Sequence, residues 1–302
     1  MRKVFTACFV VLLISACAAV YKNSLGARLA DMAREADARV GIAVLRNTQQ
    51  WTVGNEKQPL LSVFKFFIAL KVLNEADNGR IHLKTRLKID ESMADKRLYS
   101  PMLEKYTAFP FDVSVAELME YMISESDNNA SDILLEYVGG AEELERYVHG
   151  IGFDDIEISV NEKEMNTDIE KQYLNKVRAR DVAKAMRTAR EGNLLSAESR
   201  SFLNKIMMNT VTGPDKIRGG LPGKTKGGHK TGSSSRKADG TKIADNDAGF
   251  VLLPNGETFY IAVMITDSKM SDTDNAGLIR RISKTVYGHL AGNAAPDPIP
   301  RY

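Results

Sequence analysis

The sequence predicts a mixed α/β protein of the α+β kind, in which an antiparallel sheet flanked by helices carries an additional all-helical lobe. Three observations predict this class. Strand-like alternation occurs near both ends of the chain, at residues 38–54 and 229–267. Helical periodicity dominates the middle, from about residue 60 to 208. The length of 302 residues leaves room for one large domain or two moderate ones with ample core.

The first 17 residues predict an export signal and not a part of the fold. A basic start, MRK, precedes an apolar run that is too short to span a bilayer comfortably and ends in LISAC. The small residues Ser15 and Ala16 before Cys17 resemble a lipobox, where bacterial lipoproteins receive their lipid. The alternative is an ordinary signal peptide cut near Ala16. Both alternatives predict export to the periplasm, and the first adds a lipid anchor at Cys17.

The composition indicates an ordinary globular protein. Hydrophobic residues make up 43% and charged residues 26%, and the net charge of +2 gives no reason to expect a nucleic-acid partner. Both cysteines, Cys8 and Cys17, lie in or at the end of the predicted leader, so the mature chain should contain no disulfide. The four histidines are far apart, so we expect no metal site.

The elements follow from hydrophobic periodicity along the chain. Residues 24–58 and 209–291 should form the α/β lobe, beginning with a helix at 23–37 and two strands. The all-helical lobe should span residues 59–208, with helices at 62–76, 115–123, 129–137, 141–149 and 179–191. A Gly-rich link, a strand at HKTGSS, a hairpin turned at 254–256 and a helix at 275–292 should complete the α/β lobe. Residues 292–302 are Pro-rich and should form a flexible tail.

The helix predicted at 62–76 contains two residues that indicate chemistry. Ser62 and Lys65 lie three residues apart, on one face of an otherwise apolar helix. A serine needs a nearby base to act as a nucleophile, and a lysine in a dry pocket loses its proton more readily. The alternative is a lysine that extends from the core into water. Ser-x-x-Lys also occurs at Ser234 and Lys237, in a polar stretch to which we assign no catalytic role.

Two further motifs carry groups that a serine-dependent reaction needs. In the Ser126–Asn128 tripeptide, Ser126 could pass a proton to a leaving nitrogen and Asn128 could hold a substrate amide. The same tripeptide is equally suited to begin a helix. In the Lys230–Gly232 tripeptide, the lysine supplies a cation for a substrate carboxylate, and the glycine lets a substrate's backbone come close.

Together, the three motifs in this order resemble the serine penicillin-recognising enzymes, which comprise penicillin-binding proteins and serine β-lactamases. The segment 162–166, EKEMN, is similar to the omega loop of class A β-lactamases, with Met165 in place of a leucine; the alternative is an exposed acidic turn. The segment LYSP resembles the family's Tyr-Ser-Pro segment and would place Tyr99 at the mouth of the cleft. The resemblance, closest to the extended-spectrum cephalosporinase branch, covers residues 24–289 and implies a β-lactamase/penicillin-binding transpeptidase-like fold.

The resemblance implies hydrolysis of β-lactam antibiotics, both cephalosporins and penicillins, by a monomer that needs no metal or organic cofactor. Ser62 would attack the lactam carbonyl, with Lys65 helping to take its proton, and Ser126 would protonate the departing nitrogen. Glu162 and Asn166 would activate the water that hydrolyses the acyl-enzyme. Whether Lys65 or Glu162, through water, is the acylation base stays open. The implied substrate-binding residues are Tyr99, Asn128, Asn166, Lys230, Thr231, Gly232 and Ser233, and the N–H groups of Ser62 and Ser233 would form the oxyanion hole.

Two features depart from the family pattern or leave an assignment open. Class A enzymes commonly brace the omega loop with an Arg–Asp pair, and here Val160 and Asn175 occupy these positions. That pair cannot form, so we expect the loop to be held by other packing, to follow a different or looser path, and to admit oxyimino-cephalosporins. The basic residue that assists the carboxylate-binding lysine is not determined, and the candidates are Lys216, Arg218 and Arg236.

Two other functions share the first three motifs. A DD-peptidase that acts on cell-wall peptide would lack a deacylating carboxylate of this kind. A β-lactam sensor would remain acylated and would need a transmembrane or signalling partner domain. The carboxylate at Glu162 favours the hydrolase over both.

Overall fold

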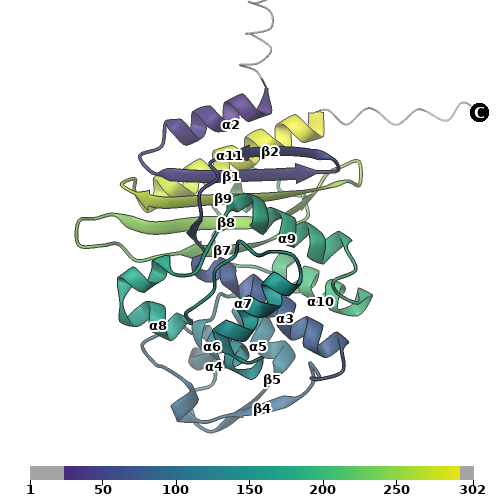
Figure 1. Cartoon of the computed structure of the whole chain (residues 1–302), viewed down its shortest axis with the longest axis vertical. Helices are drawn as coiled ribbons and strands as arrows, with labels where there is room; N and C mark the ends of the chain where they lie inside the picture. The colour runs from purple at the N-terminus through teal and green to yellow at the C-terminus, as the bar shows by residue number, and fades with distance from the viewer. Residues whose placement is uncertain (1–23, 293–302) are drawn as a thin grey trace, which may run out of the picture.

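A five-stranded antiparallel sheet with the order β2-β1-β9-β8-β7 forms the centre of one lobe (Figure 1). The structure, a computed structural model, describes residues 24–292. The strands are β1 (Arg39–Arg46), β2 (Gln49–Val53), β7 (Gly227–Ser233), β8 (Lys242–Leu252) and β9 (Thr258–Ser268). Because β1 pairs with β9, the two ends of the chain meet in one sheet, as the sequence predicted.

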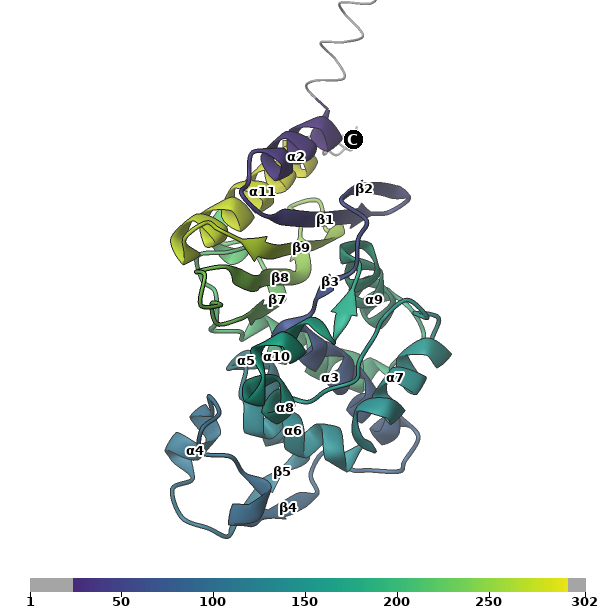
Figure 2. The same cartoon turned by 60° about the vertical axis from the view of Figure 1, so that its left-hand side comes forward.

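The sheet is covered by helices on both faces (Figure 2). Helices α2 (Leu25–Arg34) and α11 (Asp272–Gly292) pack on one face, and α9 (Ala179–Glu191) packs on the other. Side chains of β9 alternate between the two cores, because successive residues of a strand point to opposite faces. Ile261 and Val263 join the core under α2 and α11, whereas Ala262 and Met264 join the larger core that continues into the second lobe.

The second lobe is built around α3 (Lys65–Asp77), whose residues are almost all buried, including Lys65. The other helices of this lobe are α4 (Pro101–Lys105), α5 (Val115–Ser124), α6 (Asn128–Tyr137), α7 (Gly140–Gly150), α8 (Glu162–Thr167) and α10 (Ala197–Met208). Four short 3-10 helices complete the described helices: η1 (Leu61–Phe64), η2 (Glu91–Met93), η3 (Ile169–Tyr173) and η4 (Arg218–Gly220). Short strand pairs join β3 (Gln58–Pro59) to β6 (Lys176–Val177), and β4 (Arg86–Ile89) to β5 (Phe111–Ser114).

The predicted fold class is confirmed, and the helix at 179–191 has the predicted bounds. The hairpin turn at 254–256 also forms, with the N–H of Gly256 donating to the carbonyl of Leu253 at 3.0 Å. Several features of the middle segment were not predicted, including α4, α8, α10 and the short β3–β6 and β4–β5 pairs. Helix α10 carried a usable signal, because Ser196 caps it and Leu203, Ile206 and Met207 have helical spacing and are buried. Strands of four residues, as in β4 and β5, are too short for periodicity to reveal.

The predicted leader with Cys17 and nearly all of the predicted tail lie outside the described residues. Within residues 24–292, none of the helices is both long enough and apolar enough to cross a bilayer. The same residues contain no cluster of three or more His, Cys, Asp or Glu side chains suited to hold a metal ion.

Candidate active site

Ser62 lies in the 3-10 helix η1, immediately before α3, where η1 contacts β7 and β8 of the sheet lobe and α3 of the helical lobe. The preceding residue, Leu61, has a φ of 44°, a left-handed conformation that costs a non-glycine residue about 1–3 kcal/mol. Surrounding hydrogen bonds hold this strained turn. Asn246 Nδ2 donates to the carbonyl oxygens of Pro59 and Leu60, and Leu60 N donates to the carbonyl of Asn175 at 2.8 Å.

Strand β7 approaches the Ser62 turn so closely that Gly232 has no room for a side chain. A Cβ on Gly232 would lie 2.7 Å from the carbonyl oxygen of Leu60 and 3.1 Å from Ser62 N. The glycine of the Lys-Thr-Gly motif therefore permits contact between β7 and the turn that carries Ser62. The backbone N–H of Ser62 and the end of β7 consequently face the same small volume.

Lys65 is fully buried, and its ammonium group lies among four oxygen acceptors. Lys65 Nζ lies 2.7 Å from the carbonyl oxygen of Ser126, 2.5 Å from Asn128 Oδ1 and 2.9 Å from Glu162 Oε1. It also lies 3.4 Å from Ser126 Oγ. The sequence alternative, a lysine that extends into water, is therefore wrong, since this ammonium group is held inside the site.

Ser126 lies between two lysines. Its φ of 62° is left-handed, and it precedes α6, which Asp127 caps by accepting from Ala130 N at 2.8 Å. Lys230 Nζ donates to the same Ser126 Oγ at 2.9 Å. Burial of Lys230, together with the nearby charge of Lys65, lowers its pKa well below the ordinary lysine value.

Glu162 completes the set and lies at the start of α8. Its Oε1 accepts from Ser62 Oγ at 3.1 Å and lies 2.9 Å from Lys65 Nζ. The position of the helix start depends on Asp132 of α6, whose two carboxylate oxygens accept from Glu162 N at 2.8 Å and from Lys163 N at 2.9 Å. Desolvation, followed by the charge of Glu162, raises the pKa of Asp132 to about 7.

Asn175 braces the omega loop, although it occupies the position of the Asp in the family's Arg–Asp pair. Its side chain is fully buried, and its Oδ1 accepts from Ser159 N at 2.8 Å and from Val160 N at 3.1 Å. Its Nδ2 donates to the carbonyl of Val160 at 2.8 Å. The amide therefore joins the same two positions, 160 and 175, through hydrogen bonds to the backbone, so the loop does not lack a brace.

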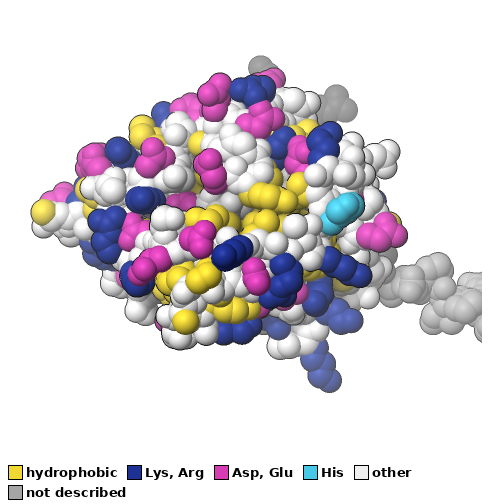
Figure 3. Space-filling model, turned by 90° about the horizontal axis from the view of Figure 1, so that it is seen from below, with side chains coloured by type: hydrophobic (Ala, Val, Ile, Leu, Met, Phe, Trp, Pro, Cys, Tyr) yellow, Lys and Arg dark blue, Asp and Glu magenta, His cyan; other side chains and the backbone are white. Residues whose placement is uncertain are grey.

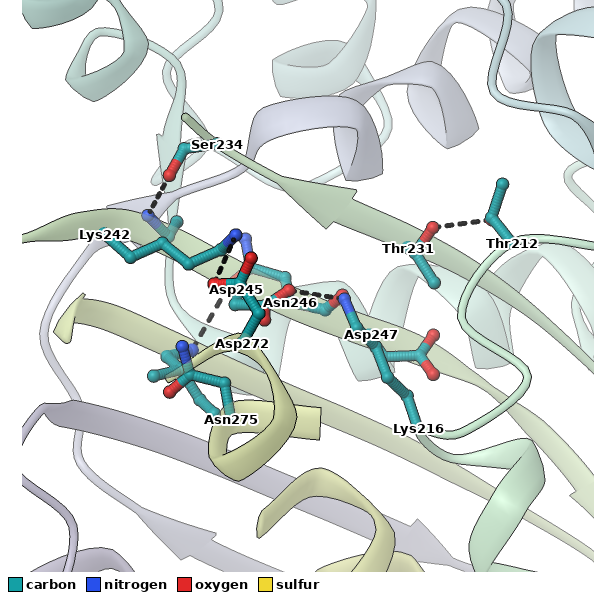
Figure 4. Close-up of polar contacts among 12 residues, drawn as sticks. Thr212, Lys216, Thr231, Ser234, Lys242, Asp245, Asn246, Asp247, Asp272 and Asn275 are labelled. Carbon is teal, nitrogen blue, oxygen red and sulfur yellow. Dashed lines mark hydrogen bonds and ion pairs between the residues drawn. The ribbon is translucent and has the colours of Figure 1, made fainter. Parts of the chain in front are cut away.

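The remaining predicted residues lie around this centre at different depths. Tyr99 is 56% exposed, and its carbonyl accepts from Asn128 N at 3.0 Å. Asn166 is exposed on α8, one turn beyond Glu162, and no hydrogen bond joins its side chain to any other residue of the described chain. Thr231 is buried, and its hydroxyl lies 2.7 Å from that of Thr212 (Figure 4). Ser233 is exposed at the end of β7.

The structure distinguishes among the three basic candidates near Lys230. Lys216 is buried beneath β7 and β8 with Asp245 (Figure 4), and its charge contributes to the lowered pKa of Lys230. Arg236 instead pairs with Asp272, away from this group. Arg218 lies exposed in η4. Of the three candidates, Lys216 is therefore the one whose charge reaches Lys230.

A buried polar pair beside Lys230 was also missed. His229 Nδ1 lies 2.8 Å from Asp247 Oδ1, and Asp247 Oδ2 accepts from Ile217 N at 3.0 Å. Asp247 lies in the middle of β8, and its position in the sequence gave no sign that it faces His229. The missed residues Asp132 and Asp247 contact residues that are distant in sequence, so no local motif could have revealed them. Asn175 was singled out in the sequence, but only as the position where a bracing Asp is absent.

The contacts form one continuous chain of polar groups. Oxygen and nitrogen atoms at 2.9–3.4 Å connect Lys230, Ser126, Lys65 and Glu162 in series, and Ser62 Oγ donates to Glu162. This arrangement provides a nucleophile with two possible bases, a hydroxyl positioned between two cations, and a buried carboxylate beside the nucleophile. A site with these parts can form and hydrolyse an acyl-enzyme.

The comparisons with known proteins agree with this chemistry. The family model of the Beta-lactamase enzyme family matches residues 24–290. A β-lactamase of Bacteroides uniformis is 44% identical over 253 residues, covering 83% of this chain and 86% of that protein. The extended-spectrum β-lactamase PER-1 of Pseudomonas aeruginosa is 35% identical over 232 residues, covering 77% of this chain and 75% of that protein.

Solved structures give the same result. A class A β-lactamase from Bacteroides cellulosilyticus superposes with a TM-score of 0.86 at 40% identity, covering 89% of this chain and 98% of that chain. The TLA-1 extended-spectrum β-lactamase superposes with a TM-score of 0.87 at 32% identity, covering 89% and 99%. The fold and the site thus define a serine hydrolase that acts through an acyl-enzyme. The chain belongs to the class A serine β-lactamases and hydrolyses β-lactams, and neither the DD-peptidase nor the sensor is favoured.

Proposed function

We propose that the residues at the lobe junction divide the hydrolysis of the lactam ring as follows. Ser62 attacks the carbonyl carbon, and its proton passes to Lys65 or, through water, to Glu162. The negative oxygen that forms is bound by the N–H groups of Ser62 and Ser233. The close approach of Gly232 to Ser62 N supports this pairing, because it brings the end of β7 beside the nucleophile.

Ser126 then gives its proton to the departing lactam nitrogen and is reprotonated from a lysine. Its hydroxyl lies between Lys65 and Lys230, at 3.4 and 2.9 Å, which supports this shuttle. Lys230, Thr231 and Ser233 bind the carboxylate on the second ring of the substrate. Lys216 adds positive potential from beneath β7, where it lies buried beside Asp245.

Hydrolysis of the acyl-enzyme is assigned to Glu162, with Asn166 helping to hold the attacking water. The observation that carries this step is the 3.1 Å contact between Glu162 Oε1 and Ser62 Oγ. A base in that position lies within one water molecule of the acyl carbon that Ser62 would carry.

Glu162→Gln tests the assignment, because it preserves the shape of the side chain and removes the base. The acyl-enzyme should accumulate, and turnover of a chromogenic cephalosporin should fall by about 10²–10⁴-fold, the usual effect of losing a general base. After digestion, mass spectrometry should find the drug on the peptide that contains Ser62. Turnover at the wild-type rate, or a label on Ser126 or Ser234, would contradict the proposed roles.

We further propose that the substrates include oxyimino-cephalosporins as well as penicillins. Two relatives named above are extended-spectrum enzymes. The omega loop also follows a path set by Asn175 and Asp132, in place of an Arg–Asp pair. The ratio of kcat/KM for a ceftazidime-like drug and a simple penicillin measures this preference. An enzyme that hydrolyses penicillins and ignores oxyimino drugs would refute it.

Export to the periplasm, anchoring through a lipid on Cys17 and a monomeric state are also proposals. The leader sequence and its LISAC end support the first two. The third rests on the family resemblance alone. Size-exclusion chromatography with light scattering tests the monomer, and a dimer at enzymatic concentrations would exclude it.

A further inference from the structure

A cavity of about 600 Å³ lies between β4, α6 and the start of α8, and none of the catalytic residues assigned above lines it. Its volume is within the range of about 300–1,000 Å³ that small-molecule sites occupy. The end of the molecule that carries β4 is the one seen in Figure 3, where hydrophobic side chains show between charged groups of both signs.

The lining of this cavity has an apolar part that is partly open to solvent. Leu87, Leu98 and Ile133 line it, together with Met93 and Tyr137. Met93 is 47% and Tyr137 38% exposed, and they are two of only six large hydrophobic side chains that are exposed among residues 24–292. Exposed apolar side chains gathered in a concave site usually mark a binding surface.

Three cations and three carboxylates line the cavity, and two of the carboxylates already have partners that compensate part of their charge. The three cations are Arg86, Lys88 and Lys163. None of them has a carboxylate at ion-pair distance anywhere in the described chain. Of the acidic residues, Asp95 pairs with its neighbour Arg97, and Asp132 accepts from two backbone N–H groups. Of the three carboxylates, only Glu136 has neither an ion-pair partner nor a backbone N–H donor among residues 24–292. The site is therefore better suited to an anion than to a cation.

Both walls of the cavity continue into the catalytic site. On one side, Asn129 of α6 fixes Asp95 by accepting from its N–H at 2.7 Å and donating to its carbonyl at 3.1 Å, and this segment leads directly to Tyr99. On the other side, Asn161 and Lys163 line the cavity and flank Glu162. A molecule that moves either wall would thus move a residue that faces the substrate.

We propose that this cavity is a second ligand site, which binds an amphiphilic organic anion with an aromatic or aliphatic body and one acidic group. The apolar lining takes the body, and Lys88 and Lys163 take the acidic group. Because the ligand leaves Ser62 accessible, it changes the rate of turnover by displacing the wall that carries Glu162 and does not compete with the β-lactam.

The probe for this site is 8-anilinonaphthalene-1-sulfonate, an aromatic sulfonate whose fluorescence increases in apolar surroundings. It should bind with one saturable site per chain. Ala94→Trp fills the cavity, and Lys88→Glu reverses a charge at its rim. Each should weaken binding about tenfold or more, the effect of losing one charge-assisted or well-packed contact. Lys224→Glu, which reverses an exposed lysine of the other lobe, should leave the affinity unchanged.

Circular dichroism establishes that each variant is folded. Binding should persist when a slowly released β-lactam occupies Ser62, and saturating probe should change kcat for a chromogenic cephalosporin. Absence of saturable binding, equal weakening by Lys224→Glu, displacement by the acylating drug, or inhibition that raises KM alone would each overturn the proposal. Because the titration monitors binding without turnover, its outcome is separate from that of the catalytic assignment.

Discussion

The hydroxyl of Ser126 lies within hydrogen-bond distance of two fully buried lysines, Lys65 and Lys230. Two ammonium groups around one hydroxyl repel each other, and burial removes the water that would screen them. The pKa of Lys230 is lowered for these reasons, with burial as the larger cause. A lysine that releases its proton more easily than usual is suited to reprotonate Ser126 after each turnover.

Asp132 positions Glu162 through hydrogen bonds to the backbone at the start of α8. In Asp132→Asn, the amide can accept only one of the two N–H groups that the carboxylate accepts, and its own NH₂ confronts the other. An unsatisfied backbone N–H costs about 1–3 kcal/mol. The start of α8 should therefore shift, and deacylation should slow by about tenfold or more. Single-turnover kinetics measures this step, and Asp112→Asn, an exposed change in the same lobe, is the matched control.

The same variant should change how stability depends on pH. The pKa of Asp132 is raised from 3.8 to about 7 by desolvation, so the folded protein holds this proton more tightly than the unfolded chain does. Its contribution to stability is therefore full below about pH 4 and is lost as the pH rises through about 7. Urea unfolding at pH 5 and pH 8 should show the variant's deficit shrinking at the higher pH. A deficit that is constant or grows would contradict the assignment.

At the scale of elements, the contact between β7 and η1 sets the geometry of the proposed oxyanion site. Gly232→Ala would place a Cβ 2.7 Å from the carbonyl oxygen of Leu60, so the strand must move away. A displacement of about 1 Å in an active site can cost on the order of 10²-fold in rate. We expect kcat/KM to fall by that order. Gly223→Ala is the matched control, because a Cβ there meets nothing within 4 Å. Equal activity of the two variants would contradict the role of β7.

The omega loop is held by a buried amide, and this changes what a substitution there should do. Asn175→Ala removes three hydrogen bonds to Ser159 and Val160 and should lower the free energy of unfolding by about 1–3 kcal/mol. Asn175→Asp keeps two acceptor contacts, but it buries an unpaired charge and sets an acceptor oxygen against the Val160 carbonyl, so its loss should be at least as large as that of Asn175→Ala. Denaturant unfolding measures both, and an Ala variant as stable as wild type would show that the brace is dispensable.

The sequence alone suggested that restoring an Arg–Asp pair would tighten this loop. Val160 is only 6% exposed and belongs to the main core, so an arginine there would have to displace apolar neighbours. The double variant Val160→Arg with Asn175→Asp should therefore be less stable than wild type. Its kcat/KM ratio for oxyimino-cephalosporins over penicillins should still fall if the loop path sets the substrate range. An unchanged ratio in a folded, active variant would show that the path of the loop does not set the substrate range.

At the scale of the whole molecule, the position of Ser24, the first described residue, determines how an anchored enzyme would face the membrane. Ser24 caps α2, which packs with α11 at the far end of the sheet lobe (Figure 1). Cys17 precedes Ser24 by seven residues (24 − 17 = 7), which span at most about 25 Å when extended. A lipid on Cys17 would keep the sheet lobe near the membrane and leave the helical lobe pointing away.

Fractionation of the producing cells tests the anchor. Wild-type protein should sediment with membranes, because the triacylated cysteine of a lipoprotein buries several acyl chains. Cys17→Ala should move the protein to the soluble fraction. Cys8→Ala, in the middle of the apolar run, should leave it with the membranes and is the matched control. Soluble wild-type protein after export would favour the ordinary signal peptide.

Local sequence determined a large part of this protein. The alternation of β1 and β9, the apolar length of α3 and the Pro-Asn-Gly turn predicted elements that the structure contains, since each depends on neighbours along the chain. The motifs at Ser62, Ser126, Glu162 and Lys230 likewise predicted a shared site. In the structure, Lys65 connects Ser126 to Glu162, and Lys230 donates to Ser126. Glu162 in turn accepts from Ser62 Oγ.

Tertiary structure alone decided the support and the surroundings of that site. Asp132 reaches Glu162 across 30 positions in sequence, and Asn246 holds the carbonyl of Leu60 across 186. The choice of Lys216 over Arg218 and the cavity beside α8 likewise exist only in the folded chain. The physical reason is that burial, pKa and hydrogen-bond partnership depend on distances between segments far apart in sequence, which periodicity and motif spacing do not contain.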